Sequence, residues 1–325
     1  MIIRPYLNIL VLFFSVVILN ACASNLINQS SFNDSSSSSQ LSAHSKQKVL
    51  IINSNQSVER YQIAESTFIE SMSDYNTKVV NLEAEKQPIE YLQDVLNTER
   101  YDLIYCIGAK ALGSIDYIDP SMPVVYTAVL NWRRFQGRNN YFGIASELSP
   151  QVQLTWFKYL FPEIRNIGVF YGEENQTLID DAKKTANNLS LKLETEMLRS
   201  DEQLMLSAKA MLNDVDALWL ISDSSTLSSI ESVEKLFNLA EKLNVPIFSY
   251  NSVFMDMGAT MSLVADLPTT ARQAALLSMK LLKNIVPKQN IQFPAGSRII
   301  LGGHKIDRYE MKLNPEGLDS VDEFR

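Results

Sequence analysis

Residues that could catalyse a reaction are few in this chain of 325 residues, and none of them forms a familiar catalytic motif. The sequence has no GxSxG nucleophile motif, no P-loop, and no GxGxxG after its first apolar run. Its two histidines, His44 in a Ser-rich segment and His304 near the C-terminal end, argue against a histidine triad or a metal site. Cys106 lies inside an apolar run, which is typical of a buried core residue. We therefore expect no enzymatic activity, no metal and no cofactor.

Composition limits the classes of partner. The chain is 46% hydrophobic and 20% charged, as globular proteins with sizeable cores are. Its formal net charge of -8 argues against nucleic acid or an anionic membrane surface as the main partner, because both require clustered Lys and Arg. Only Cys22 and Cys106 are present, which excludes a disulfide framework.

The first 46 residues indicate the destination of the protein. Arg4 provides a positive n-region, and residues 7–19 form an apolar run that is short for a membrane span but suits a signal peptide. Leu19-Asn20-Ala21-Cys22 resembles a bacterial lipobox, so residues 1–21 are expected to be a lipoprotein signal peptide and Cys22 the lipidated residue. The alternative is an ordinary secretory signal with a chance cysteine. Residues 22–46 are expected to be a Ser-rich disordered tether.

Apolar periodicity from residue 48 onward predicts alternating strands and helices. The first set comprises strands at 48–52, 77–82, 103–107, 123–129 and 141–145, with helices at 58–75 and 89–96 and a short helix after 108. The pattern then restarts, with helices at 151–161, 177–189, 201–212 and 228–243 and strands at 166–171, 192–197, 217–221 and 246–249. This alternation predicts parallel sheets with right-handed crossovers.

The fold class we expect is α/β, with two Rossmann-like lobes. Residues 123–150 read as the passage between the lobes. A strand at 258–264, a helix at 267–285 and a strand at 298–301 could then complete both sheets by crossing back. Residues 47–143 plus 264–290 would form lobe 1, and residues 144–263 plus 291–325 lobe 2. Three connections would make a three-stranded hinge that opens and closes.

Several segments, taken in order, resemble one known family. They are Asp102-Leu103-Ile104 through Gly108, Pro123 to Val129 (PVVYTAV), Gly143-Ile144-Ala145-Ser146, Ile167 to Tyr171 (IGVFY), Asp216 to Asp223, Val245 to Phe248 (VPIF), Gly258-Ala259 and Ala271 to Ala275 (ARQAA). Their order and spacing from Lys48 to about Leu318 resemble the ABC-transporter substrate-binding proteins that include tryptophan- and tyrosine-binding lipoproteins. This family is a branch of the type I periplasmic binding proteins.

The resemblance implies a small molecule bound between the lobes, at the carboxyl ends of the strands. It maps ligand contacts in the first lobe to Ser54, Asn55, Gly108, Ala109, Thr127 and Asn131, and in the second to Ser146, Tyr171, Asp223, Ser224, Tyr250 and Asn251. Ala109 and Ser224 stand where many relatives have Thr and Asn, so the identity of the ligand is left open.

An amino-acid-like ligand needs donors for its carboxylate and an acceptor for its ammonium group. The Gly108 turn with Thr127 could supply donors, and Asp223 the negative charge. Tyr126, Trp132, Tyr171 or Tyr250 could provide a stacking surface. The alternatives are that Asp223 only caps the following helix and that the tyrosines only pack at strand ends. Asp266, just before Pro268, is expected to be a cap or turn residue.

The expected function is that of a lipid-anchored, extracytoplasmic solute-binding protein that delivers its ligand to an ABC permease. Two alternatives stay open: a ligand sensor that signals to a membrane-bound receptor, and an envelope protein whose cleft is vestigial. The expected location is the cell envelope, on the periplasmic face in a Gram-negative host, with contact to the membrane through the lipid and no nucleic-acid partner.

Overall fold

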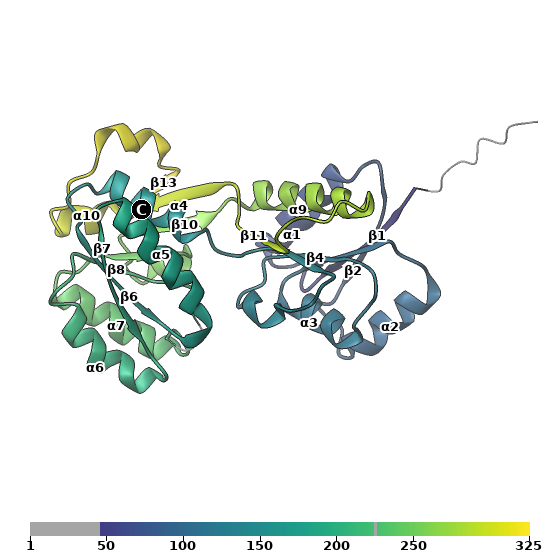
Figure 1. Ribbon diagram of the computed structural model, residues 1–325, viewed down its shortest axis with the longest axis horizontal. Helices are drawn as coiled ribbons and strands as arrows, with labels where there is room; N and C mark the ends of the chain where they lie inside the picture. Colours follow the sequence, from purple (N-terminus) through teal and green to yellow (C-terminus); the bar gives the residue numbers. More distant parts are fainter. Residues whose placement is uncertain (1–45, 224–225) are drawn as a thin grey trace, which may run out of the picture. The chain divides into compact units, whose positions relative to one another are not determined.

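The computed structural model describes residues 46–223 and 226–325. Two β-sheets with helices on both faces account for most of this part (Figure 1). We call each sheet with its helices a lobe. The expected α/β fold of two Rossmann-like lobes is confirmed.

The first sheet has six strands in the order β11-β5-β4-β3-β1-β2, and all its pairings are parallel. Its strands are β1 (Lys48–Asn53), β2 (Asn76–Asn81), β3 (Leu103–Ile107), β4 (Val124–Thr127), β5 (Tyr141–Ile144) and β11 (Ile291–Gln292). Helices α1 (Glu59–Ser71) and α9 (Leu267–Leu282) cover one face, and α2 (Pro88–Thr98) and α3 (Ala109–Ile118) cover the other.

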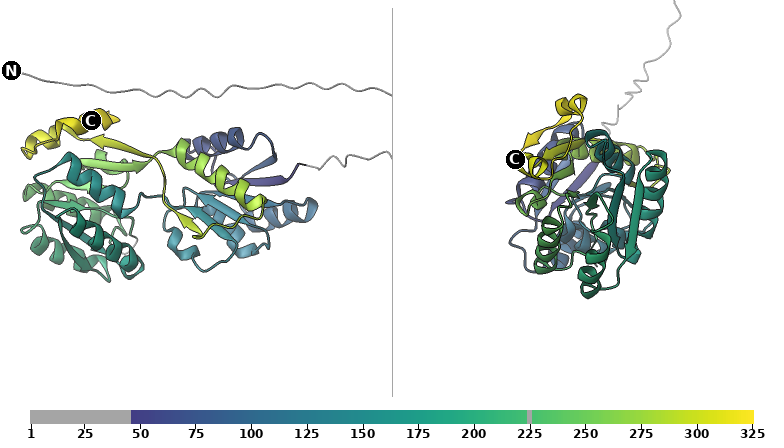
Figure 2. Two further views of the ribbon diagram at one scale, coloured as in Figure 1. Left: turned by 45° about the horizontal axis from the view of Figure 1, so that its top comes forward. Right: turned by 90° about the vertical axis from the view of Figure 1, so that its left-hand side faces the viewer.

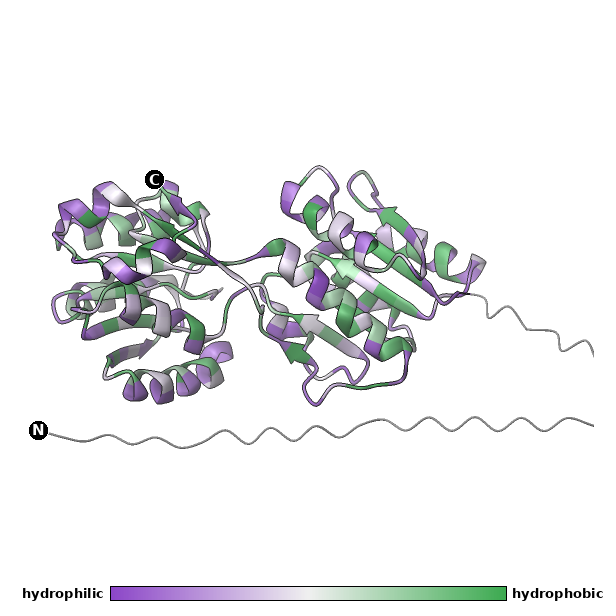
Figure 3. Cartoon of the chain, turned by 90° about the horizontal axis from the view of Figure 1, so that it is seen from above, coloured by the Kyte–Doolittle hydropathy of each residue, from purple (hydrophilic) through white to green (hydrophobic). Residues whose placement is uncertain are grey.

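Burial on both faces explains why the strands of this sheet read as continuous apolar runs. In β1, Val49 and Ile51 pack toward α1 and α9, whereas Leu50 and Ile52 pack toward α2 and α3. All four side chains are fully buried. Figure 3 shows hydrophobic residues concentrated in the strands and hydrophilic residues along the outer faces of the helices. This is the pattern of a sheet covered on both faces.

The second sheet has seven strands in the order β13-β12-β10-β9-β8-β6-β7. Its strands are β6 (Asn166–Tyr171), β7 (Lys192–Met197), β8 (Ala217–Trp219), β9 (Ile247–Ser249), β10 (Met261–Ala265), β12 (Ser297–Leu301) and β13 (Glu323–Phe324). Helices α4 (Pro150–Leu160) and α5 (Gln176–Asn188) pack on one face. Helices α6 (Asp201–Met211), α7 (Ile230–Lys242) and α8 (Val253–Asp256) pack on the other. β10 and β12 pair antiparallel, so this sheet is only mostly parallel.

The chain passes between the two sheets three times, as expected. The connections are residues 144–150 after β5, residues 265–267 between β10 and α9, and residues 292–297 between β11 and β12. Asp266 N donates a hydrogen bond to Gly296 O at 3.0 Å, which joins the second connection to the third. In Figure 2, α9 lies beside α1 in the first lobe, while the yellow strands of the C-terminal segment belong to the second.

The remaining elements are short and were not expected from the sequence. They are η1 (Trp132–Phe135), η2 (Glu173–Asn175), α8, β11, α10 (Gly303–Arg308), η3 (Pro315–Ser320) and β13. β11 pairs with β5 and thus belongs to the first sheet, just beyond the expected lobe boundary at residue 290. Two-residue strands depend on a neighbouring strand for their definition, so no local periodicity predicts them.

Candidate functional site

A cavity of about 570 Å³ is lined by residues of both lobes. This volume is within the usual range for small-molecule sites, roughly 300–1,000 Å³. The first lobe contributes side chains from α1, from the end of β4 and from the connection after β5. The start of α9, which packs on the first sheet, also contributes. The second lobe contributes residues that follow β9, the end of β10, and residues of β12, of β13 and directly after it. The polar and charged lining residues are Arg60, Thr127, Ser146, Tyr250, Asn251, Ser252, Asp266, Thr270, Arg298, Glu323 and Arg325.

Four residues predicted as ligand contacts line this cavity: Thr127, Ser146, Tyr250 and Asn251. Thr127 ends β4, Ser146 follows β5, and Tyr250 and Asn251 follow β9. Each therefore lies at the carboxyl end of a parallel strand, where open α/β sheets place their ligands.

The hydroxyl groups on the first-lobe wall are held in place by buried neighbours. Thr127 Oγ1 is 2.7 Å from Tyr105 OH, and both side chains are buried. Ser146 Oγ donates to Glu147 Oε2 at 2.8 Å. Because the Ser146 hydroxyl hydrogen points to Glu147, the lone pairs of Ser146 Oγ remain able to accept a hydrogen bond from a ligand.

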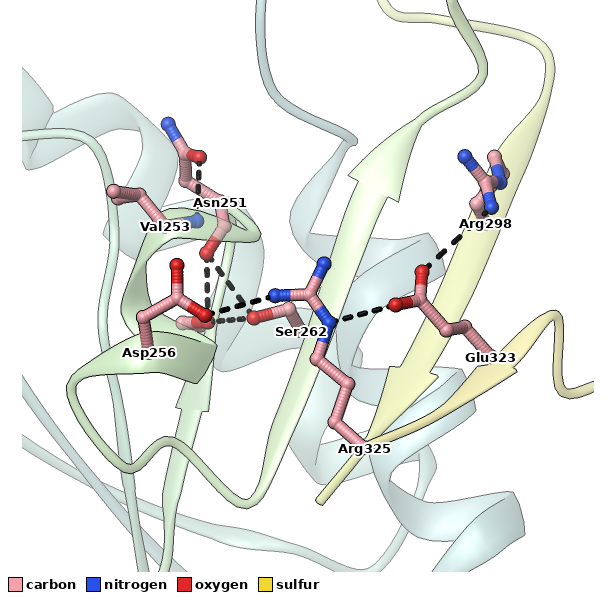
Figure 4. Close-up of polar contacts among 8 residues, drawn as sticks. Asn251, Val253, Asp256, Ser262, Arg298, Glu323 and Arg325 are labelled. Carbon is pink, nitrogen blue, oxygen red and sulfur yellow. Dashed lines mark hydrogen bonds and ion pairs between the residues drawn. The ribbon is translucent and has the colours of Figure 1, made fainter.

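On the second-lobe wall, Tyr250 presents a half-buried ring that meets Phe254 edge to face at 5.7 Å. Burial raises the pKa of the Tyr250 hydroxyl, and the negative charges of Glu147 and Asp223 act in the same direction. Asn251 is fixed by its backbone carbonyl, which accepts from Ser262 Oγ at 3.1 Å, and by its Oδ1, which accepts from Val253 N at 3.2 Å (Figure 4). Tyr250 is thus a neutral aromatic surface beside fixed polar groups.

Ser54, Asn55, Gly108 and Ala109 are not among the described residues that line the cavity. Ser54 Oγ accepts from Ala111 N at 2.9 Å, so one of the free N–H groups at the start of α3 is already satisfied. Gly108 has a φ of +85°, and a Cβ there would lie 2.7 Å from Ser54 Oγ. The Asn55 Oδ1 accepts from Ser57 N within its own turn. These residues build the β1–α1 and β3–α3 turns, and their contact with a ligand stays a prediction.

Asn131 and Tyr171 also lie outside the cavity lining. Asn131 adopts a left-handed conformation with φ of 53°, and its Oδ1 is buried without a hydrogen-bond partner in the described part of the chain. Tyr171 is 6% exposed and its OH donates to Gln176 Oε1 at 3.1 Å.

Asp223 holds two loops of the second lobe together. Its Oδ2 accepts from Gly172 N at 2.6 Å and from Asn175 Nδ2 at 2.7 Å. Its Oδ1 accepts from Thr226 N at 3.0 Å, as a capping residue would. Asp223 is 4% exposed and does not line the cavity. Ser224 and Cys22, predicted as a ligand contact and the lipidation site, lie outside the described residues.

Three of the four candidate stacking residues, Tyr126, Trp132 and Tyr171, are buried and do not line the cavity, so that only Tyr250 does. Tyr126 packs directly on Gly143, where a Cβ would lie 2.3 Å from its ring. Trp132 Nε1 donates to both carboxylate oxygens of Glu147 at 3.1 Å. Arg133 donates to the same carboxylate at 2.8 Å and stacks on the Trp132 ring at 4.4 Å. Glu147, which was not predicted, therefore organises the first connection between the lobes.

Sequence reasoning missed most of the charges in the cavity: Arg60, Arg298, Glu323 and Arg325. Only Asp266 could be interpreted from the sequence, because it stands just before Pro268. Its expected capping role is confirmed, since its Oδ2 accepts from Thr269 N at 2.8 Å. Of the other four, Arg60 lies on helix α1, Arg298 on β12, Glu323 on the edge strand β13, and Arg325 directly after β13. Nothing local in the sequence determines which way such residues face.

A second cavity, of about 440 Å³, lies within the second lobe and contains Phe161, Asp216, Pro246 and Tyr309 among its lining residues. Asp216 and Pro246 immediately precede β8 and β9, so this cavity is at the opposite, amino-terminal edge of the sheet. Because it receives no side chain from the first lobe, it does not fit the expected site.

Other kinds of site find no support in residues 46–223 and 226–325. This part contains no group of acidic, His and Cys residues able to hold a metal ion, and no helix long and apolar enough to cross a membrane. Cys106 is fully buried, as expected, and burial raises the pKa of its thiol. A thiol in this state is a poor nucleophile.

Comparison with known proteins agrees with this geometry. A family profile described as ABC transporter substrate binding protein matches residues 65–300. Among solved structures, an ABC domain from Streptococcus pneumonia in complex with L-Trp is 16% identical, with a TM-score of 0.58 over 86% of this chain and 100% of that one. A ligand-free, open substrate-binding protein with adhesive properties from Clostridium difficile is 14% identical, with a TM-score of 0.65 over 85% and 98%. A conserved domain protein from Vibrio cholerae is 15% identical, with a TM-score of 0.57 over 86% of this chain and 100% of that one. The comparison with curated proteins gives no match.

Proposed function

The chain belongs to the family of ABC transporter substrate-binding proteins, and from this premise we propose that it captures a small amino-acid-like or aromatic molecule for an ABC importer. The observation that carries the proposal is the cavity of about 570 Å³ lined by side chains of both lobes. A ligand can favour one arrangement of two lobes over another only through contacts that differ between them. A cavity shared by both lobes meets that requirement.

The lining chemistry supports a ligand with both apolar and polar parts. Tyr250 offers an aromatic surface, while Ile63, Ala64 and Pro268 add apolar area. Thr127, Ser146 and Asn251 place polar atoms beside this surface. We propose these three residues and Tyr250 as ligand contacts. The structurally similar ABC domain in complex with L-Trp supports an aromatic amino acid as the first compound to test.

We also propose that the protein is anchored to the cell envelope through lipid on Cys22, within the lipobox-like Leu19-Asn20-Ala21-Cys22. Delivery to a permease requires only that the folded lobes stay near the membrane, and a lipidated tether would keep them there. Cys22→Ser should move the protein from the detergent phase to the aqueous phase in a phase-separation assay. Equal partitioning of the two proteins would contradict the anchor.

The binding function is tested with the chain carrying Cys22→Ser, so that no lipid is attached. Its thermal midpoint is measured against amino acids, purines, sugars and small aromatic acids. A compound present at 100 times its Kd should add about 2.7 kcal/mol to the free energy of unfolding. Small-angle scattering with the same compound should show a smaller radius of gyration. If no compound raises the midpoint and scattering is unchanged throughout, the proposed function is wrong.

A further inference from the structure

The charged residues of the cavity differ in sign from the chain as a whole. The formal net charge of the protein is -8. The cavity nevertheless contains three arginines, Arg60, Arg298 and Arg325, against two acids, Asp266 and Glu323. A site with this balance attracts anions rather than cations.

Both acids are already occupied by groups of the protein. The Asp266 carboxylate accepts from Thr269 N at 2.8 Å and caps α9. Glu323 Oε1 accepts from Arg325 Nε at 2.7 Å, and Asp256 Oδ1 lies 3.1 Å from Arg325 NH1 (Figure 4). Arg325 is thus held by two carboxylates, and neither Asp266 nor Glu323 is left as a dedicated partner for a ligand cation.

The other two arginines, Arg60 and Arg298, have guanidinium N–H groups that make no close ion pair within the described part of the chain. The acidic oxygens nearest to Arg298 are Asp322 Oδ1 at 4.0 Å and Glu323 Oε2 at 3.9 Å. Both distances exceed the 2.7–3.2 Å of an ordinary N–H···O hydrogen bond. Arg60 has no ion pair within the described part of the chain. It lies over the Tyr61 ring at 5.0 Å and contacts the Tyr61 hydroxyl at 3.4 Å.

These two cavity-lining arginines come from different lobes, because Arg60 is in α1 of the first lobe and Arg298 is in β12 of the second. A ligand that excludes water from the cavity makes an unpaired charge there more costly. A carboxylate or similar planar oxyanion removes that cost, since a guanidinium group can donate two parallel hydrogen bonds to it. A neutral ligand leaves both guanidinium groups without such a partner, and a cation repels them.

We propose that the ligand carries an anionic oxygen group and that Arg60 and Arg298 select for it. The proposal rests on the proposed function and adds the charge class of the ligand. It also moves anion recognition away from the Gly108 turn, which does not line the cavity. Arg325, which is bonded to Glu323 and Asp256, serves to hold Glu323 in place beside Arg298.

The test compares L-tryptophan, L-tyrosine and L-phenylalanine with their carboxamides, which keep the shape of the acid without its negative charge, and with their decarboxylated amines, which lack the carboxyl group. Titration calorimetry on the chain with Cys22→Ser should show that at least one acid binds about tenfold or more tightly than its amide and its amine. The expected size follows from a hydrogen bond to a charged group, whose loss weakens binding by about an order of magnitude or more.

Variants then assign the effect to the two arginines. Arg60→Gln and Arg298→Gln should each weaken binding of the acid about tenfold and change binding of the amide less than about threefold. Arg272→Gln is the matched control, because Arg272 lies on α9 with its NH2 3.1 Å from Thr269 Oγ1 and does not line the cavity. It should leave both affinities unchanged. Unliganded thermal midpoints establish that all variants fold.

The outcomes separate this inference from the function it rests on. If an amide or an amine binds as tightly as its acid, or if the double variant of Arg60 and Arg298 keeps full affinity for the acid, the charge assignment is wrong and the binding function stands. If none of these probes and no other compound of the stability screen binds, both are wrong.

Discussion

At the scale of single residues, Glu147 shows how a buried charge fixes the first connection between the lobes. Its side chain is 2% exposed and accepts hydrogen bonds from Trp132, Arg133 and Ser146. Arg133, its ionic partner, is 10% exposed. The carboxylate therefore orients the Ser146 hydroxyl at the cavity wall and also neutralises a buried guanidinium group.

We predict that Glu147→Gln lowers the free energy of unfolding by about 3 kcal/mol, because it leaves Arg133 buried without a counter-charge. Urea denaturation measures this value. Glu163→Gln is the control, since its ion pair with Lys312 is exposed at 62% and 75% and should contribute about 0–1 kcal/mol. Equal losses in the two variants would show that the buried position of Glu147 has no special effect.

Asp223 allows its capping role to be separated from a role in ligand binding. Asp223 Oδ2 accepts hydrogen bonds from both Gly172 N and Asn175 Nδ2. In Asp223→Asn, one of the two carboxylate oxygens becomes an NH2 group, which cannot accept a hydrogen bond. We predict a loss of about 2 kcal/mol in unfolding free energy with less than about a twofold change in ligand affinity. Calorimetric titration and urea denaturation of the same sample measure both. A large loss of ligand affinity in a stably folded variant would instead indicate that Asp223 contacts the ligand.

At the scale of elements, the packing of β4 beside β5 in the first sheet depends on Gly143 in β5. The Tyr126 ring of β4 occupies the space that a side chain would take, with its nearest atoms 2.3 Å from an ideal Cβ position. Tyr126 is fully buried and cannot move outward without disturbing its neighbours. This contact explains a glycine in the middle of a strand, where it otherwise weakens pairing.

We predict that Gly143→Ala destabilises the protein by about 1–3 kcal/mol through overpacking. Gly113→Ala provides the matched control in α3, where no atom lies within 4 Å of the added Cβ. Because alanine favours helix over glycine, this control should stabilise the protein by about 0.5–1 kcal/mol. Thermal unfolding of both variants tests the contrast, and the same sign of change in the two would disprove it.

Elements with their own periodicity were predicted from the sequence, but not all with the right bounds: the helix expected at 58–75 spans Glu59–Ser71, and the strand expected at 217–221 ends at Trp219. The strands at 103–107, 166–171 and 192–197 are confirmed residue for residue. β11 and β13 could not be predicted, since each has only two residues and exists through pairing with a distant strand. Thr127, Ser146, Tyr250 and Asn251, which the family resemblance implied, line the cavity. Placing Arg298 and Arg325 there required the order of the strands in the sheet.

At the scale of the whole molecule, the second and third connections form one unit. Asp266 N donates to Gly296 O at 3.0 Å, and the Asp266 side chain caps α9. Gly296 packs against the start of that helix, since a Cβ there would lie 3.0 Å from the Cβ and Cγ2 of Thr269 and 3.1 Å from the Cβ of Asp266. Both connections also adjoin the cavity through Asp266 and Arg298. The two connections are therefore coupled, and a relative movement of the lobes that displaces one of them must also displace the other or break the hydrogen bond between Asp266 N and Gly296 O.

We predict that Gly296→Val weakens ligand binding about fivefold, because its branched side chain forces the third connection away from α9 and removes one backbone hydrogen bond. Gly303→Ala is the control, since its nearest contact is Arg325 O at an ordinary 3.7 Å. Titration of the compound found in the stability screen gives the affinities, and thermal midpoints of the unliganded variants report on the lobes themselves. The cores of both lobes lie in their sheets, away from this contact, so the affinity should fall more than the midpoint suggests. If Gly296→Val binds as tightly as the parent protein, the joined connections do not control closure, and the arrangement of the lobes must depend on the first connection and its buried Glu147.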